Sequence, residues 1–108
     1  MYNASKVVRV AALSLAVIFP TLGSAEDKTI EIKEYKFEPT QITIPAGTTV
    51  TWVNKDDDSH TVTDKGKKFS SKDLDKNDKY SYTYKEPGTY PYFCSLHKSM
   101  TGTITVTK

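Results

Sequence analysis

Apolar and polar residues alternate along most of the chain from Glu26 onward, and this period of two constrains the fold more than any other feature. Such alternation is typical of strands with one buried face, and β-branched and aromatic residues fit that role well. The alternating apolar positions fall into separate runs: Ile30 and Ile32; Ile42 and Ile44; Val50 and Trp52; Tyr80, Tyr82 and Tyr84; Tyr90, Tyr92 and Cys94; Ile104 and Val106.

Turn-forming residues separate these runs, for example Pro45-Ala46-Gly47 and Glu86-Pro87-Gly88. Residues 54–78 are polar and charged, and we expect loops there, with a short edge strand or one helical turn near residues 70–74. Several short strands in one small domain predict an all-β fold, an antiparallel sandwich or barrel.

The first residues have the order of a secretory signal peptide. Lys6 and Arg9 form a basic start, residues 10–19 are mainly apolar, and small residues at 23–25 precede Glu26. The apolar run is much shorter than the roughly 20 residues that span a bilayer. We therefore predict a signal peptide over residues 1–25, a mature domain over residues 26–108 without a membrane span, and a periplasmic location.

Charge gives no reason to expect a nucleic-acid partner. The whole chain has 15 basic and 13 acidic residues, and the predicted cleavage removes two basic residues and no acidic one. The mature domain is then formally neutral, so the apparent basicity belongs to the signal peptide.

Cys94 is the only cysteine, so the domain cannot form an internal disulfide. Exported domains of this size commonly rely on disulfides for stability. A lone thiol in an oxidising compartment is either a liability or a ligand. Taken alone, Cys94 could equally be a small buried apolar residue.

Four residues stand out as candidate metal ligands: His60, Cys94, His97 and Met100. They are the only cysteine, both histidines and the only methionine besides Met1. A thiolate, two imidazoles and a thioether form a soft donor set that favours copper, and a long axial methionine is typical of blue-copper electron-transfer sites. Zinc prefers four strong ligands, or three with a water molecule. Met100 could instead fill a gap in the core.

The motifs around these residues resemble those of the plastocyanin-like cupredoxins. The spacing Cys94-x-x-His97-x-x-Met100 resembles the short ligand loop of amicyanin in particular. The other matching motifs are Phe37-x-Pro39, Ile42-x-Ile44-Pro45-x-Gly47, Val50-x-Trp52-x-Asn54, Ser59-His60-Thr61-Val62, Pro87-Gly88-Thr89-Tyr90-x-Tyr92 and Met100-x-Gly102.

The resemblance implies a Greek-key β-sandwich with one type 1 copper ion, Cu(I) or Cu(II), held by His60, Cys94, His97 and Met100. It implies a one-electron carrier and not an enzyme. The expected partners are redox proteins, with a dehydrogenase or cytochrome as donor and a cytochrome or oxidase as acceptor. We expect the chain to be a monomer, with the His97 imidazole reaching the surface.

The sequence departs from the amicyanin pattern beside both histidines. Leu96 and Lys98 stand where amicyanin has prolines, and Thr61 stands where an asparagine is usual. That asparagine links the two ligand loops, so we expect Thr61 and Ser95 to make a different link.

Two other functions remain open at this point. The chain could deliver copper to an oxidase, or it could be a binding module that has lost its metal. The tyrosines are most simply core residues and cross-strand pairs. The acidic run Asp56-Asp57-Asp58 predicts a solvated turn, or else an acidic patch facing a cationic redox partner.

Overall fold

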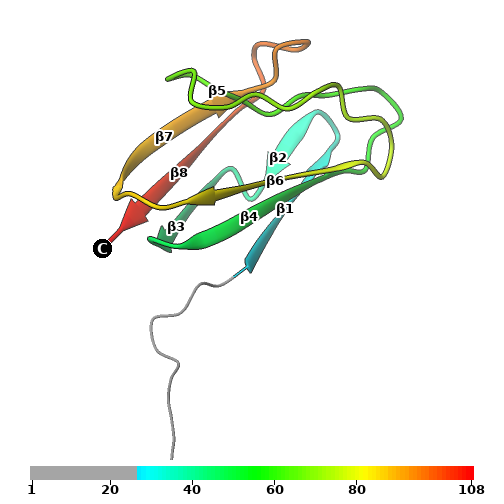
Figure 1. The fold of residues 1–108 in the computed structure, drawn as a ribbon. Helices are drawn as coiled ribbons and strands as arrows, with labels where there is room; N and C mark the ends of the chain where they lie inside the picture. The colour runs from blue at the N-terminus through cyan, green and yellow to red at the C-terminus, as the bar shows by residue number, and fades with distance from the viewer. Residues whose placement is uncertain (1–26) are drawn as a thin grey trace, which may run out of the picture.

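The computed structural model describes residues 27–108, and the predicted signal peptide, residues 1–25, lies outside the described residues. Residues 27–108 form strands and loops without a helix (Figure 1), so none of them provides a helix able to cross a membrane. The strands are β1 (Asp27–Lys33), β2 (Lys36–Glu38), β3 (Gln41–Pro45), β4 (Thr48–Asn54), β5 (Thr63–Asp64), β6 (Lys79–Tyr84), β7 (Gly88–Phe93) and β8 (Thr101–Thr107). Every alternating run of the sequence corresponds to one of these strands.

The strands form two four-stranded sheets, with the orders β2-β1-β4-β6 and β3-β8-β7-β5. The prediction of an all-β sandwich is confirmed. The sequence predicts antiparallel pairing, whereas β1 pairs with β4 and β3 pairs with β8 in parallel. The reason is that β3 lies in the opposite sheet, so β4 returns to the first sheet beside β1. Alternation shows which face of a strand is buried, but not the direction of its neighbour.

Aromatic side chains fill the space between the sheets. Trp52 of β4 meets Tyr92 of β7 edge-to-face, with ring centroids 5.4 Å apart, so this contact joins the two sheets. Tyr92 also packs against the backbone of Gly102, where an added Cβ would lie 2.4 Å from Tyr92 Cζ. The prediction that the tyrosines are core residues holds best for Tyr84 and Tyr92, which are fully buried. Large aromatic rings contribute much of the buried apolar area of a small domain.

The polar segment after β4 contains one short strand and two isolated bridges. Strand β5 pairs with β7 at one edge of its sheet, so the expected edge strand is present. The helical turn considered for residues 70–74 is absent. Instead, the backbone of Leu74 exchanges two hydrogen bonds with that of His60, of 2.8 and 3.1 Å. This pairing ties the backbone that carries His60 to residue 74 of the same polar segment.

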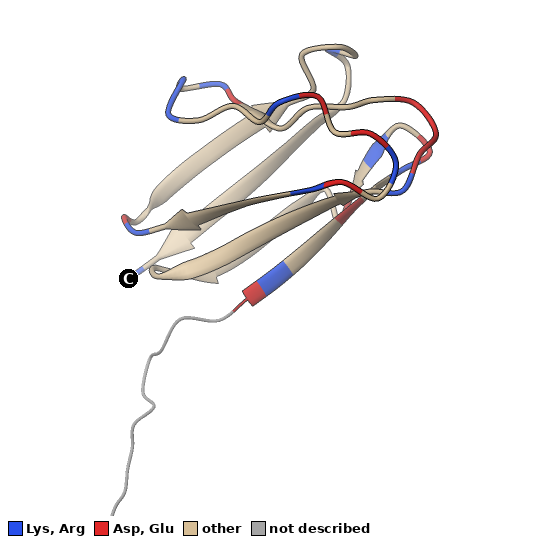
Figure 2. Ribbon diagram, turned by 45° about the vertical axis from the view of Figure 1, so that its right-hand side comes forward, with Lys and Arg blue, Asp and Glu red and all other residues tan. Residues whose placement is uncertain are grey.

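Charged residues lie mainly in the connections between strands, as Figure 2 shows. Much of the exposed strand surface is polar without charge, and hydroxyl pairs line it. Thr49 faces Thr83, and Thr51 faces Ser81, each pair with oxygen atoms 2.7 Å apart. Electrostatic attraction to a partner would therefore act mainly through the loops.

Candidate metal centre

The loop that joins β7 to β8 brings three of the predicted ligands close together in the chain. Its backbone closes on itself: Cys94 N–H donates to the Met100 carbonyl at 3.1 Å, and Met100 N–H donates to the His97 carbonyl at 2.9 Å. The His97 N–H in turn donates to the Cys94 carbonyl at 3.2 Å. Because both ends of the loop continue into paired strands, the loop is held with little conformational freedom.

His60 reaches the same point from the segment that follows β4. Its side chain is fully buried, and its backbone is paired with Leu74 in both directions. His60 Nδ1 lies 3.8 Å from Cys94 Sγ, and His97 Nδ1 lies 3.7 Å from the same sulfur atom. All three donor atoms lie within 4.8 Å of one another.

This spacing suits a single metal ion. Metal–nitrogen and metal–sulfur bonds to zinc are about 2.0–2.3 Å long, and copper is similar in size, so two ligands of one ion lie about 3–4 Å apart. The described chain therefore presents a soft sulfur donor and two imidazole nitrogens that fit one ion of the copper type.

Met100 completes the predicted set at the far end of the loop. Its side chain is 5% exposed and belongs to the same buried cluster as Cys94. A thioether in this place can act as a weak ligand while it also fills the core. The ligand and core interpretations of Met100 are thus compatible.

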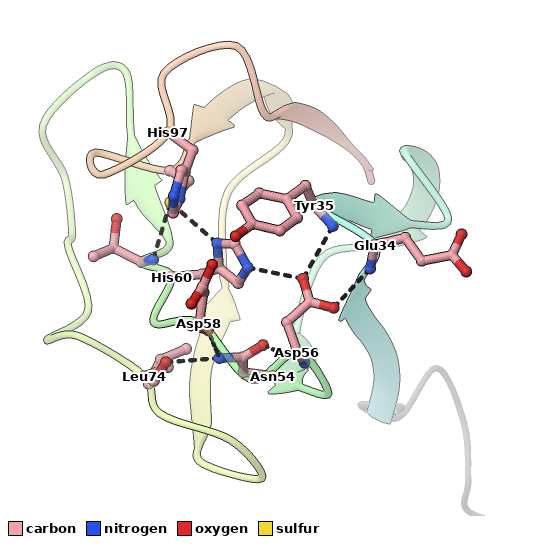
Figure 3. A network of polar contacts seen from close by, with 10 residues as sticks. Glu34, Tyr35, Asn54, Asp56, Asp58, His60, Leu74 and His97 are labelled. Atoms are coloured by element: carbon pink, nitrogen blue, oxygen red, sulfur yellow. Dashed lines mark hydrogen bonds and ion pairs between the residues drawn. The ribbon is translucent and has the colours of Figure 1, made fainter.

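The second nitrogen of His60 is bound by a carboxylate, which the sequence analysis missed. His60 Nε2 lies 2.8 Å from Asp56 Oδ2 (Figure 3). An ionised carboxylate only accepts hydrogen bonds, so this contact favours the tautomer with the proton on Nε2, which leaves the Nδ1 lone pair for a metal. The prediction of a solvated turn fits Asp57 and Asp58 but not Asp56, whose side chain is only 14% exposed. Its position four residues before His60 is the signal that could have revealed this role.

Asn54 holds the segment between β4 and His60 in place. It is fully buried, and its Nδ2 donates to the carbonyls of Asp58 and Leu74 at 2.9 and 2.7 Å. Its Oδ1 accepts a bond from the Asp56 N–H at 2.9 Å. The Asn54 side chain therefore helps to position the backbone that carries Asp56 and His60.

Thr61 and Ser95 link the two ligand segments, as the sequence suggested. The Thr61 hydroxyl lies 2.7 Å from the Ser95 N–H, which donates to it, and 2.9 Å from the Ser95 hydroxyl. The Thr61 N–H donates to Cys94 Sγ at 3.3 Å. A hydrogen bond of this kind orients the ligand atom that accepts it. Threonine therefore provides a direct link in the place of asparagine.

A protein-family model described as a cupredoxin-like domain matches residues 8–106. The chain belongs to this family. The match covers nearly the whole chain, and the fold and the cluster of donor atoms described above agree with it.

Individual cupredoxins are similar over most of the chain. Amicyanin-alpha of Methylorubrum extorquens is 32% identical over 97% of this chain and 89% of its own length. A purple cupredoxin from Nitrosopumilus maritimus is 32% identical in sequence, with a TM-score of 0.69 over 74% of this chain and 99% of that one. An amicyanin variant in its Cu(I) form is 28% identical, with a TM-score of 0.71 over 74% of this chain and 81% of that one.

These similarities confirm the predicted resemblance to cupredoxins and to amicyanin in particular. They also support the prediction of one copper ion per chain, because the structurally similar amicyanin is described with Cu(I). Membership of this family agrees with the prediction that the chain is not an enzyme.

Proposed function

We propose that this cupredoxin is an exported blue (type 1) copper protein that carries one electron at a time between redox proteins. The proposed copper ligands are His60, Cys94, His97 and Met100. The observation that carries the proposal is the convergence of one sulfur and two imidazole nitrogens within 4.8 Å of one another, on loops that paired strands support. Bound copper would supply the one-electron couple between its Cu(II) and Cu(I) states.

The residues of the site are suited to keeping one geometry in both oxidation states. Cys94 and His60 are fully buried, and a hydrogen bond holds each side chain: the sulfur accepts one from the Thr61 N–H, and the imidazole Nε2 donates one to Asp56. Ligands that are fixed in this way cannot rearrange much, and small rearrangement favours rapid electron exchange.

His97 provides the route to a partner. Its side chain is partly exposed, whereas His60 is buried, so only the His97 edge approaches the surface. The neighbouring Leu96 is 48% exposed and offers an apolar contact beside it. We infer that a redox protein docks here, with a dehydrogenase or cytochrome as donor and a cytochrome or oxidase as acceptor.

Export rests on the first residues of the sequence. We propose that residues 1–25 are a signal peptide and that residues 26–108 are the periplasmic domain. The N-terminal sequence of protein recovered from the periplasm tests this: the expected first residue is Glu26. Recovery of the full-length chain from the cytoplasm would refute it.

Visible and EPR spectra of the copper-loaded mature protein test the proposed function. A copper–thiolate bond should give an intense visible absorption with one ion per chain. Cys94→Ser should abolish this absorption, while Ser99→Ala, an exposed change in the same loop, should preserve it. Protein that stays colourless with one equivalent of Cu(II) would contradict the proposal.

The same preparation separates an electron carrier from a copper carrier. A protein that delivers copper should release Cu(I) to a competing chelator within minutes. An electron carrier should keep its ion through repeated cycles of oxidation and reduction. The complete burial of Cys94 and His60 favours retention.

A further inference from the structure

Tyr35 lies against both proposed histidine ligands, although neither the family motifs nor the alternation pattern points to it. Its ring centroid is 5.0 Å from that of His60 and 4.9 Å from that of His97, and both contacts are edge-to-face. The two imidazole rings are themselves 4.9 Å apart, so the three rings form one cluster (Figure 3). Edge-to-face aromatic pairs stabilise their partners beyond the area that they bury.

Packing in the core does not explain why Tyr35 lies at this position, because the residue is 44% exposed. Among the described residues, only Tyr35 and Leu96 are large, exposed and hydrophobic. The geometry of the hairpin does not favour a tyrosine here either. Glu34 and Tyr35 form the two-residue connection between the paired residues Lys33 and Lys36. Gly and Asn adopt the two positive φ angles of such a connection most easily.

The backbone at this turn is held in an unfavourable conformation. Glu34 and Tyr35 have φ values of 54° and 59°, in the left-handed region that side chains with a Cβ disfavour. Asp56 compensates, because its two carboxylate oxygens accept the N–H groups of Glu34 and Tyr35 at 2.7 and 3.0 Å. Backbone strain that a neighbouring group supports in this way is common at functional sites.

The same carboxylate holds the buried histidine. Asp56 Oδ2 is 3.0 Å from the Tyr35 nitrogen and 2.8 Å from His60 Nε2. One side chain therefore sets both the orientation of the His60 ring and the place of the tyrosine that packs on it.

We propose that Tyr35 is a positioning residue for the copper site: clamped by Asp56, its ring braces the imidazoles of His60 and His97. The brace matters most for His97, because that ring is partly exposed and the His97 N–H and carbonyl bond to residues of the same loop. The proposal rests on the assignment of both histidines as ligands. Its expected consequence is slower loss of the metal and a single ring orientation in the free chain.

The test measures the rate at which the Cu(I)-loaded protein gives its ion to excess bicinchoninate. Tyr35→Ala should release Cu(I) roughly tenfold faster than the wild type, since two ring contacts are lost. Tyr35→Phe keeps the ring and should stay within about twofold of the wild type. Lys36→Ala, an exposed change in the same hairpin, is the matched control.

Two results would contradict the proposed positioning role of Tyr35. One is an equal release rate for Tyr35→Ala and the wild type; the other is a Tyr35→Phe rate that equals that of Tyr35→Ala, which would assign the effect to the hydroxyl. A wild type that binds no copper would instead refute the proposed function. In that case NMR relaxation of the His97 ring in the metal-free protein still tests the brace: Tyr35→Ala should make this ring more mobile, and unchanged mobility refutes it.

A double-mutant cycle tests the role of Asp56 in the clamp. Asp56→Ala should release Cu(I) about 10–100-fold faster, the usual effect of losing the partner of a metal-bound histidine. Adding Tyr35→Ala to Asp56→Ala should then raise the release rate by a smaller factor than Tyr35→Ala does alone, because the turn has already lost the carboxylate that holds it. Fully additive effects would show that the carboxylate and the tyrosine act separately. Asp57→Ala is the control, since this neighbour is exposed and pairs with Lys76.

Discussion

The two histidines approach the same sulfur atom from very different surroundings. His60 is fully buried, its second ring nitrogen is bonded to Asp56, and its backbone is paired with Leu74. His97 is partly exposed, and its backbone N–H bonds within its own loop. One half of the site is thus built like a protein core, and the other half like a surface loop.

This difference suits two tasks of the proposed copper site. The buried half would hold donor atoms in place, and the exposed half would bring one ring edge to the surface. Tyr35 is the one described side chain with ring contacts to both halves.

The largest contrast should come from removing each imidazole in turn. His60→Ala leaves a cavity and removes one hydrogen-bond partner of the Asp56 carboxylate, so the metal-free protein should lose about 2–4 kcal/mol of unfolding free energy. His97→Ala should cost the metal-free protein less, about 1 kcal/mol, because the ring is partly exposed and loses mainly its contacts with the Tyr35 and His60 rings. Urea unfolding without metal measures both. Equal losses would mean that the two halves do not differ as the structure indicates.

Asn54→Ala should show that the buried half depends on its supports. The change removes two hydrogen bonds from Nδ2 and one to Oδ1, of which the bond to the Leu74 carbonyl is buried and the other two are partly buried. We expect a loss of about 2–3 kcal/mol in urea unfolding, because three hydrogen bonds and a fully buried side chain are lost together. Ser99→Ala in the exposed loop is the control and should have little effect. A loss as small as that of the control would argue against a rigid buried half.

Thr61→Val should weaken the connection between the halves. Valine has the shape of threonine but removes the hydroxyl that accepts the Ser95 N–H at 2.7 Å. The backbone bond from residue 61 to Cys94 Sγ would remain. We expect a loss of about 1 kcal/mol in unfolding free energy, and a smaller loss for Thr61→Ser, which keeps the hydroxyl. If valine and serine behave alike, the hydroxyl bond does not join the halves.

Tyr92→Phe extends the comparison to the core and should have the smallest effect at neutral pH. Within residues 27–108, the Tyr92 and Tyr84 hydroxyls are buried without a hydrogen-bond partner, unlike the ring nitrogen of His60. Removing an unpaired hydroxyl should therefore change stability by less than about 1 kcal/mol. A loss of several kcal/mol would show that Tyr92 has a polar partner.

Raising the pH above neutral should show how the burial of these two tyrosines affects stability. Burial raises the pKa of Tyr92 and of Tyr84, because the phenolate is poorly solvated inside the protein. Their contribution to stability is complete below the ordinary pKa of tyrosine, about 10, and is lost as the pH rises above it, by about 1.4 kcal/mol per pH unit for each group. Tyr92→Phe should unfold less readily than the wild type above this pH, as circular dichroism can show; an identical pH profile would refute the argument.

The sequence predicted much of this architecture because the signals that carry it are local. Alternation at Ile30, Val50 and Ile104 needs only neighbouring residues to mark a half-buried strand. The spacing of Cys94, His97 and Met100 likewise lies within one loop. Parallel pairing and the roles of Asp56 and Tyr35 were missed, because they depend on how distant segments meet.

By itself, the sequence determined that the fold is all-β, that the candidate metal ligands form a soft donor set, and which family the chain resembles. These follow from residue type and from distance along the chain. Only the tertiary structure decided which nitrogen of His60 faces the sulfur, which of three aspartates supports it, and that a turn some 60 residues before His97 lies against its ring. The physical reason is that hydrogen bonds and ring contacts act over a few ångströms of space, and folding alone brings such residues within that range.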